Sequence, residues 1–273
     1  MRDTIIKVFM GKYWQVIKNS WSESTAYRLN FILWRVRRVV NLLLVYFLWH
    51  AVTAGKNTLF GYNESQILTY VLLSNVVTSF ILATKTLDIG DEINSGNLTN
   101  YLLKPINYFS LWWAKDAADK ALNVFFSILE VVLLIFFLKP QFILQTNVLF
   151  LLFFTLSMGL GMILYFYLSV LLGFIGFYSP EVWAPRFVFF VISQFFIGSL
   201  FPLDILPKWL YLSLQALPFP YLLFFPLKIY LGQLNVQEIS IGIAISLVWI
   251  IILKETAVRV WNKGLLDYSA QGR

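Results

Sequence analysis

The chain has 273 residues, of which 59% are hydrophobic and only 13% charged, and its formal net charge is +7. A soluble domain of this length needs more polar surface than this composition supplies, which excludes an ordinary globular protein. The absence of cysteine excludes disulfides and thiolate metal sites, and a single histidine, His50, excludes a histidine-rich zinc site.

The N-terminal residues 1–28 are predicted to form an amphipathic helix that lies on the inner leaflet and contacts membrane lipid. Its apolar residues recur at steps of three and four, which is the spacing of one helix face. Packing of this helix against the rest of the chain stays open as an alternative. The apolar face is formed by Ile6, Met10, Tyr13, Ile17 and Trp21.

Six long apolar segments predict an all-α polytopic membrane protein, with a single transmembrane domain over residues 1–273. No ionisable side chain occurs between Lys139 and Glu181, a gap far longer than the roughly 20 residues that a spanning helix needs. The runs are continuous, whereas barrel strands alternate over roughly 10 residues. The predicted apolar cores are Val39–Thr53, Ile67–Thr84, Ala121–Leu138, Val148–Tyr178, Phe187–Leu203 and Val236–Leu253.

The distribution of Lys and Arg predicts the orientation of these spans. With the N-terminus inside, 17 of the 21 basic residues fall in inner segments, so both termini are expected in the cytoplasm and the chain in the cell membrane. The same bias explains the net positive charge, which therefore does not indicate a nucleic-acid partner. The first span is expected to extend back past three arginines that reach the inner headgroups, namely Arg35, Arg37 and Arg38.

Residues 85–120 form the predicted inner loop between the second and third spans. Three acids in its first part, Asp88, Asp91 and Glu92, are expected to present their carboxylates to the cytoplasm. Gly96 is expected to break a short helix, and Lys104-Pro105 to end it. The alternative is a solvated connector whose acids only favour a helix N-terminus. An apolar edge is formed by Leu98, Leu102 and Leu103, and a second interfacial helix is predicted for residues 106–120.

Glu130 is the only acid in the middle of a predicted span core, since Glu238 lies at the very start of the last one. Asn123 and Ser127 precede Glu130 by seven and three residues, so the three side chains form one polar stripe on the third span. Intramembrane acids usually face a bundle interior or a water-filled cavity. Glu130 is therefore either a pathway residue that faces substrate or a cation, or a packing residue, and Arg38 is a possible partner.

Small residues and prolines mark the second half of the chain. Small pairs four or three residues apart permit close helix approach, and packing within one subunit is their favoured role. Residues 202–232 combine prolines with strongly apolar stretches, which predicts two short re-entrant or interfacial helices on the outer side. The small pairs are Ser157/Gly161, Gly173/Gly176, Ser240/Ala244 and Gly242/Ser246.

The inner loop resembles that of the permease subunits of the type-2 ABC exporter family. The stretch from Glu92 through Gly96 and Leu98 to Leu102, Leu103 and Pro105 is similar to that family's pattern of a Glu, a Gly, a Leu and a closing Leu-x-Pro. The resemblance implies an ATPase-coupling helix in this loop, a separate ATP-binding-cassette ATPase subunit as its partner, and pairing as a homodimer or with a second similar permease.

The chain itself contains no Gly-x-x-x-x-Gly-Lys-Ser/Thr phosphate loop, so no cofactor is expected on it, and ATP and Mg²⁺ are expected on the partner. No catalytic or metal-binding arrangement stands out, and the chain is expected to be a transport subunit rather than an enzyme. Two other functions stay open, a secondary transporter or channel, and a membrane anchoring or assembly protein without transport. The few charges in the spans favour an apolar or amphipathic cargo.

Overall fold

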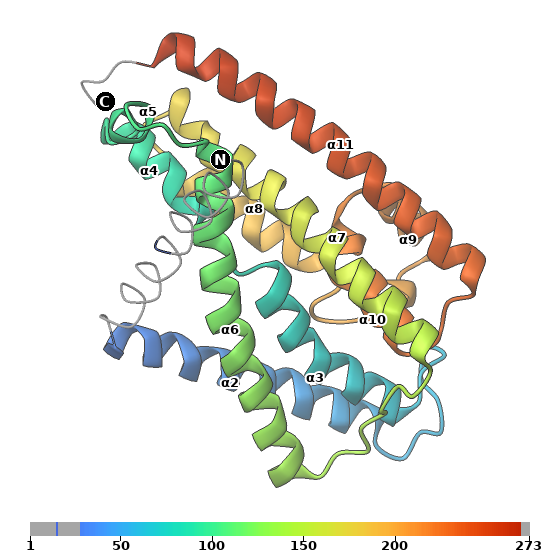
Figure 1. Cartoon of the computed structure of the whole chain (residues 1–273). Helices are drawn as coiled ribbons and strands as arrows, with labels where there is room; N and C mark the ends of the chain where they lie inside the picture. The colour runs from blue at the N-terminus through green and yellow to red at the C-terminus, as the bar shows by residue number, and fades with distance from the viewer. Residues whose placement is uncertain (1–14, 16–27, 269–273) are drawn as a thin grey trace, which may run out of the picture.

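The computed structural model describes Gln15 and residues 28–268, and within them it contains helices and no strand (Figure 1). An isolated antiparallel bridge joins Leu59 to Tyr62. The all-α prediction is confirmed. The amphipathic helix predicted for residues 1–28 lies almost entirely outside the described residues.

The helices follow one another with short connections. The longer ones are α2 (Arg28–Thr53), α3 (Glu64–Ile81), α6 (Tyr108–Leu138), α7 (Val148–Gly173), α8 (Trp183–Phe196) and α11 (Val236–Asp267). The short ones are η1 (Thr86–Asp88), α4 (Ile89–Asn94), α5 (Thr99–Leu102), η2 (Phe174–Phe177), η3 (Leu203–Ile205), α9 (Lys208–Gln215), η4 (Phe219–Leu222) and α10 (Phe224–Tyr230).

Three helices of the described chain are long and apolar enough to cross a membrane: α6, α7 together with η2, and α11. A fourth candidate is the pair formed by α3 and residues 86–94, which is bent by 46°. Helix α8 has only 14 residues, and α2 carries four arginines in its first half. The chain is therefore a multi-pass membrane protein, and the count of six spans stays a prediction.

Two helices extend well beyond their predicted apolar cores. The helix predicted for residues 106–120 and the third span form one helix, because α6 begins at Tyr108 and continues without a break to Leu138. Asn107 caps this helix by accepting a hydrogen bond from the Ser110 N–H (3.0 Å), and no Gly or Pro follows Pro105 to interrupt it. Helix α11 likewise runs beyond the predicted core end at Leu253, to Asp267.

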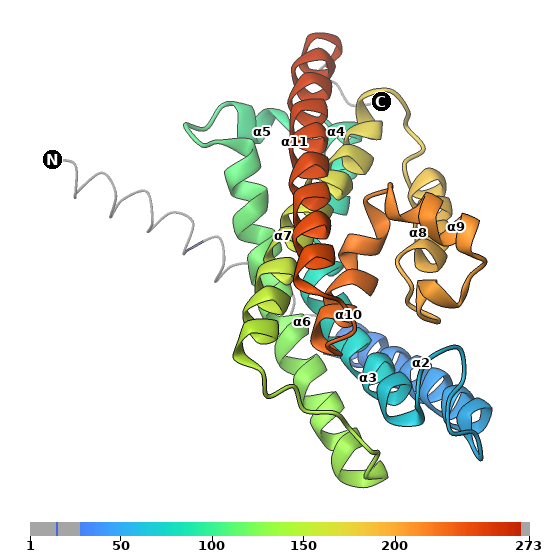
Figure 2. The same ribbon diagram turned by 90° about the vertical axis from the view of Figure 1, so that its right-hand side faces the viewer.

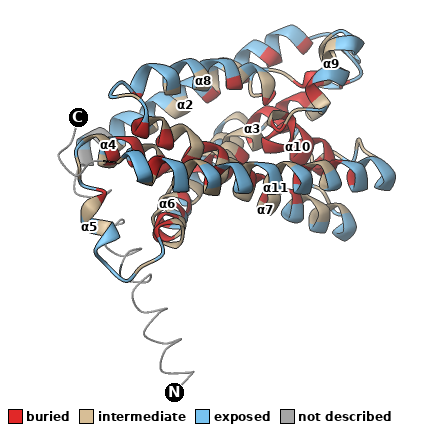
Figure 3. Ribbon diagram, turned by 90° about the horizontal axis from the view of Figure 1, so that it is seen from above, coloured by how far each residue is buried: buried red, intermediate tan, exposed pale blue. Residues whose placement is uncertain are grey.

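Helix α7 is central, since it contacts α11, α10, α3 and α4. Buried residues gather where these helices meet, whereas α2 and α8 expose most of their outward surface (Figure 3). Exposed apolar side chains on α2, such as Leu44 at 65%, are typical of a surface that faces lipid rather than water.

The segment predicted as two outer helices contains four short ones, η3, α9, η4 and α10. Prolines stand at the N-caps of η3, α9 and η4, where a missing N–H costs least. Every residue from Pro220 to Tyr230 is buried, so the second half of the segment packs inside the fold. The depth at which these helices enter a membrane stays a prediction.

Glycines allow the closest helix approaches in the fold. A Cβ placed on Gly176 would lie 2.8 Å from the Gly90 carbonyl oxygen, and one on Gly242 would lie 2.2 Å from the ring of Phe225. Gly161 and Gly173 are similarly crowded by residues of this chain. At these four glycines the favoured role, packing within one subunit, is confirmed.

We expect Gly176→Ala to destabilise the fold by about 1–3 kcal/mol, because the added methyl group would meet backbone atoms of α4 that cannot rotate away. Gly159→Ala is the matched control, because nothing lies within 4 Å of its Cβ position. Thermal unfolding of both variants in the same detergent measures the difference. Equal melting temperatures would contradict the close approach of α4 to η2.

Candidate functional site

The predicted inner loop folds into a compact segment, here called the α4–α5 segment (residues 89–105), which contains α4, α5, the turn between them and the residues that end α5. It lies at the same end of the molecule as the last turns of α11 (Figure 2). Gly96 has φ +76° in the turn, a conformation that favours glycine. The predicted break at Gly96 is thus confirmed, and α5 ends at Leu102, just before Lys104-Pro105.

One face of the α4–α5 segment is seated in the bundle. Ile89, Ile93 and Leu98 are buried, and they belong to an apolar cluster that includes Phe174 of η2 and Ala257 of α11. Tyr268 donates a hydrogen bond to the Gly96 carbonyl (2.8 Å), so the chain beyond α11 also contacts the turn. The sequence did not indicate this contact, because Tyr268 follows Gly96 by 172 residues.

Glu92 points into the protein. Its carboxylate accepts hydrogen bonds from Lys115 Nζ (3.2 Å) and the Tyr108 hydroxyl (3.2 Å), and only 16% of its side chain is exposed. Burial raises the pKa of Glu92, while Lys115 and Tyr108 act in the opposite direction. The expectation that all three acids face the solvent is therefore wrong for Glu92. Lys115, about two turns into α6, supplies the charge that holds Glu92 inward.

The other two acids remain at the surface. Asp91 is 76% exposed, and its carboxylate lies 3.9 Å from Arg186 Nη1 of α8. Asp88 is also exposed, in η1 just before α4. The Arg186 guanidinium packs against Gly90, so a side chain at that position would collide with it. Asn94 adds a hydrogen bond to the Pro180 carbonyl (2.9 Å), which also joins α4 to the segment before α8.

The outer face of the α4–α5 segment combines apolar and polar groups. Leu103 is 80% exposed and Leu102 is 44% exposed, and Pro105 is exposed beside them. Leu98, predicted to share their edge, is instead fully buried. An open hollow of about 540 Å³ adjoins these residues and is lined by Glu92, Asn97, Asn100, Tyr101, Leu103 and Lys104.

The predicted pathway residues lie elsewhere, between α2, α3 and α6. Arg35 contacts both Glu130 (Nη1 to Oε1, 3.3 Å) and the Asn123 side chain (3.2 Å), and Asn75 donates to the other Glu130 oxygen (3.3 Å). Asn123 and Glu130, two of the three residues of the predicted polar stripe, thus both contact the guanidinium of Arg35. Ser127 is fully buried, and within the described chain its hydroxyl has no hydrogen-bond partner.

The possible pairing of Glu130 with Arg38 is corrected to Arg35. Arg38 instead donates to the Ser79 hydroxyl (3.0 Å) of α3. The two arginines lie about one turn apart on the same side of α2, so the sequence could place both near α6 but could not decide between them. His50 forms an exposed pair with Glu64 (2.7 Å), consistent with a polar residue near a helix end.

The α4–α5 segment combines a buried face with exposed apolar and charged side chains. No group of three or more His, Asp or Glu side chains able to hold a metal ion occurs among the residues that the structure describes. What the α4–α5 segment presents is a rigid surface, with a buried face fixed to α6, α7, α8 and α11 and an outer face of Leu102, Leu103 and Asp91.

Comparison with protein families shows what the chain is similar to. A sequence model of a protein family described as ABC-2 family transporter protein matches residues 39–272, which is most of the chain and includes the whole α4–α5 segment. A comparison with curated proteins finds no match. The family match confirms the resemblance drawn from the inner loop. The chain therefore belongs to the ABC-2 family of transporter proteins, as a membrane permease of an ABC-type system.

Proposed function

We propose that this chain is the permease subunit of an ATP-driven exporter, and that a separate ATP-binding-cassette ATPase docks on the α4–α5 segment. The observation that supports this most directly is that the segment has one buried face and one exposed face. Its buried face is fixed to four helices, and its outer face presents exposed Leu103 together with the exposed carboxylate of Asp91. Apolar anchors with a charged rim are typical of protein docking surfaces.

The proposal gives the ion pairs of the segment distinct roles. Glu92 and Lys115 hold α4 against α6, so Glu92 sets the position of the docking surface rather than contacting the partner directly. Asp91 is free to exchange its long contact with Arg186 for a basic group on the ATPase, which orients the partner more than it tightens binding. Closure of the ATPase around ATP and Mg²⁺ then displaces the segment and the helices fixed to it.

The remaining features of the proposal come from the sequence. The bias of Lys and Arg places the α4–α5 segment and both termini in the cytoplasm, on the side where ATP is available. Export as the direction of transport, and a homodimer or a pair with a similar permease, are what the family resemblance implies. Six spans from one chain make a thin pathway, which also favours a route between two permeases.

Glu130 gives little support to a secondary transporter or channel. Its carboxylate already pairs with Arg35 and accepts a hydrogen bond from Asn75, so its charge is compensated inside the protein. Ion flux through the purified chain alone, driven by a gradient in liposomes, would favour that alternative over an ATP-driven permease. A non-transporting anchor would bind its partner without changing the partner's ATP hydrolysis.

We expect Leu103→Ser to weaken binding of the ATPase that co-purifies with the intact chain by about tenfold, because an exposed leucine that becomes buried on docking contributes about 1.5–3 kcal/mol. Leu144→Ser is the control, since Leu144 is 74% exposed and belongs to the connection between α6 and α7. That connection lies at the opposite end of the bundle from α4 (Figure 1). Quantitative co-purification from cells measures both variants. Unchanged binding by Leu103→Ser would contradict docking at α5.

We expect Glu92→Arg to abolish ATP hydrolysis stimulated by the permease, because it places two cations side by side against Lys115. The exchanged pair Glu92→Arg with Lys115→Glu restores an attraction at the same place, so it should recover a substantial part of the activity. Hydrolysis by the reconstituted complex is the measurement. Failure of the exchange to recover activity, with normal folding, would show that Glu92 contacts the partner itself.

A further inference from the structure

The helix that leads into the α4–α5 segment is interrupted inside the protein. Helix α3 ends at Ile81, residues 82–85 are not helical, and η1 begins at Thr86 after the bend of 46°. A helix end leaves carbonyl groups without intrahelical partners, and a new helix leaves N–H groups without them. At this depth in the bundle the chain itself must supply the missing partners.

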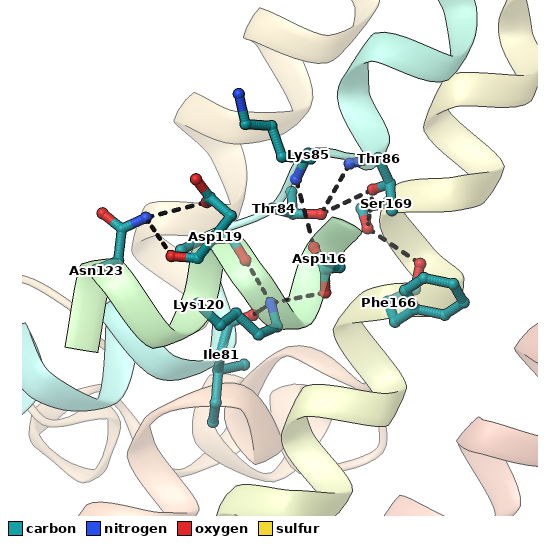
Figure 4. Close-up of polar contacts among 11 residues, drawn as sticks. Ile81, Thr84, Lys85, Thr86, Asp116, Asp119, Lys120, Asn123, Phe166 and Ser169 are labelled. Atoms are coloured by element: carbon teal, nitrogen blue, oxygen red, sulfur yellow. Dashed lines mark hydrogen bonds and ion pairs between the residues drawn. The ribbon is translucent and has the colours of Figure 1, made fainter. Parts of the chain in front are cut away.

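One ion pair on α6 supplies partners to both sides of the interruption (Figure 4). Lys120 Nζ donates hydrogen bonds to the carbonyl of Ile81 (3.0 Å), the last residue of α3, and to that of Ala83 in the interruption. Asp116, paired with Lys120 at 3.0 Å, accepts a hydrogen bond from the backbone N–H of Lys85 (3.3 Å). The lysine therefore binds the end of one helix, and the aspartate binds the residue before the next.

Hydroxyl groups extend this contact to α7. Thr86, the first residue of η1, donates to the Ser169 hydroxyl (2.7 Å), and Ser169 donates onward to the Phe166 carbonyl (3.0 Å). Thr84 contacts the Thr86 hydroxyl (2.9 Å) from within the interruption. The bend is consequently held between α6 on one side and α7 on the other (Figure 4).

Stability alone does not explain this pair. The side chains of Lys120 and Asp116 are 3% and 0% exposed, and removing two charges from water costs about as much as their attraction returns. A pair of apolar side chains of similar size would fill the same space without the cost of removing two charges from water. Only the charged pair, however, also places a cation at a helix C-terminus and an acceptor at the following N–H.

We propose that Asp116 and Lys120 are positioning residues that fix the angle between α3 and α4, so that the two helices move as one rigid body. This inference rests on the proposed function for the source of motion, which is displacement of the α4–α5 segment by the ATPase. A flexible link at residues 82–85 would let α4 move while α3 stays in place. The pair removes that freedom and transmits the displacement into the membrane.

The test uses two spin labels that report the angle. The chain has no cysteine, so Ser65→Cys on α3 and Ser95→Cys after α4 create the only labelling sites. The test variant is Asp116→Leu with Lys120→Met, which removes the two charges of the pair together. The control is Arg38→Met, which removes a cation bonded to Ser79 of α3 but not to the interruption.

Pulsed electron resonance in nanodiscs measures the label distance, first for the chain alone and then for its complex with the co-purified ATPase, trapped with ATP, Mg²⁺ and vanadate. For the intact chain and for Arg38→Met we expect one narrow distance that trapping leaves unchanged. For the double variant we expect loss of the narrow distance, and a further shift on trapping, because α4 then moves without α3.

A double variant that keeps the narrow, unchanged distance overturns the inference, as does a broad distance in the intact chain. If Arg38→Met also lost the narrow label distance, any lost contact of α3 would loosen the angle between α3 and α4. That result would also overturn the inference about Asp116 and Lys120. Failure of any ATPase to bind the intact chain refutes the proposed function instead, and the measurements on the chain alone still decide the role of the pair. Thermal unfolding of the double variant confirms that it is folded.

Discussion

Wherever a helix in this fold is interrupted, its free backbone N–H and C=O groups need hydrogen-bond partners from the protein itself, and this requirement governs the fold. The carbonyls at helix ends and in the adjoining turns are bound by side chains from distant elements. Trp49 donates to Leu200 and Tyr70 to Gly198 after α8, while Gln145 donates to Tyr230 at the end of α10. Lys120 donates to the Ile81 carbonyl at the end of α3, and Tyr268 donates to the Gly96 carbonyl in the turn before α5. These bonds allow short and bent helices to exist among long ones.

The same requirement explains what sequence reasoning could and could not predict. The helical class, the break at Gly96 and the family of the chain follow from local patterns of apolar, glycine and charged residues. The inward turn of Glu92 does not, because it depends on Lys115, which lies on another helix. The choice of Arg35 over Arg38 depends on how α2 is rotated against α6, and hydrophobic periodicity does not resolve neighbours one turn apart.

The continuity of α6 links the two regions that the sequence presented separately. One helix carries Lys115, which holds Glu92, then the pair of Asp116 and Lys120, and then Asn123 and Glu130, which meet Arg35. An interfacial helix followed by a separate span would have placed a joint between these groups. Because no joint exists, the position of the α4–α5 segment and that of the polar groups deep in the bundle are fixed by the same rigid element.

The length of α11 has a further consequence. Its 32 residues extend about 48 Å, whereas the hydrocarbon core of a bilayer is about 30 Å thick. Its last turns contribute Ala257 and Trp261 to the apolar seat of α4. In the orientation that the sequence predicts, this surplus length is expected to raise the seat of α4 above the hydrocarbon core, where a water-soluble protein can reach it.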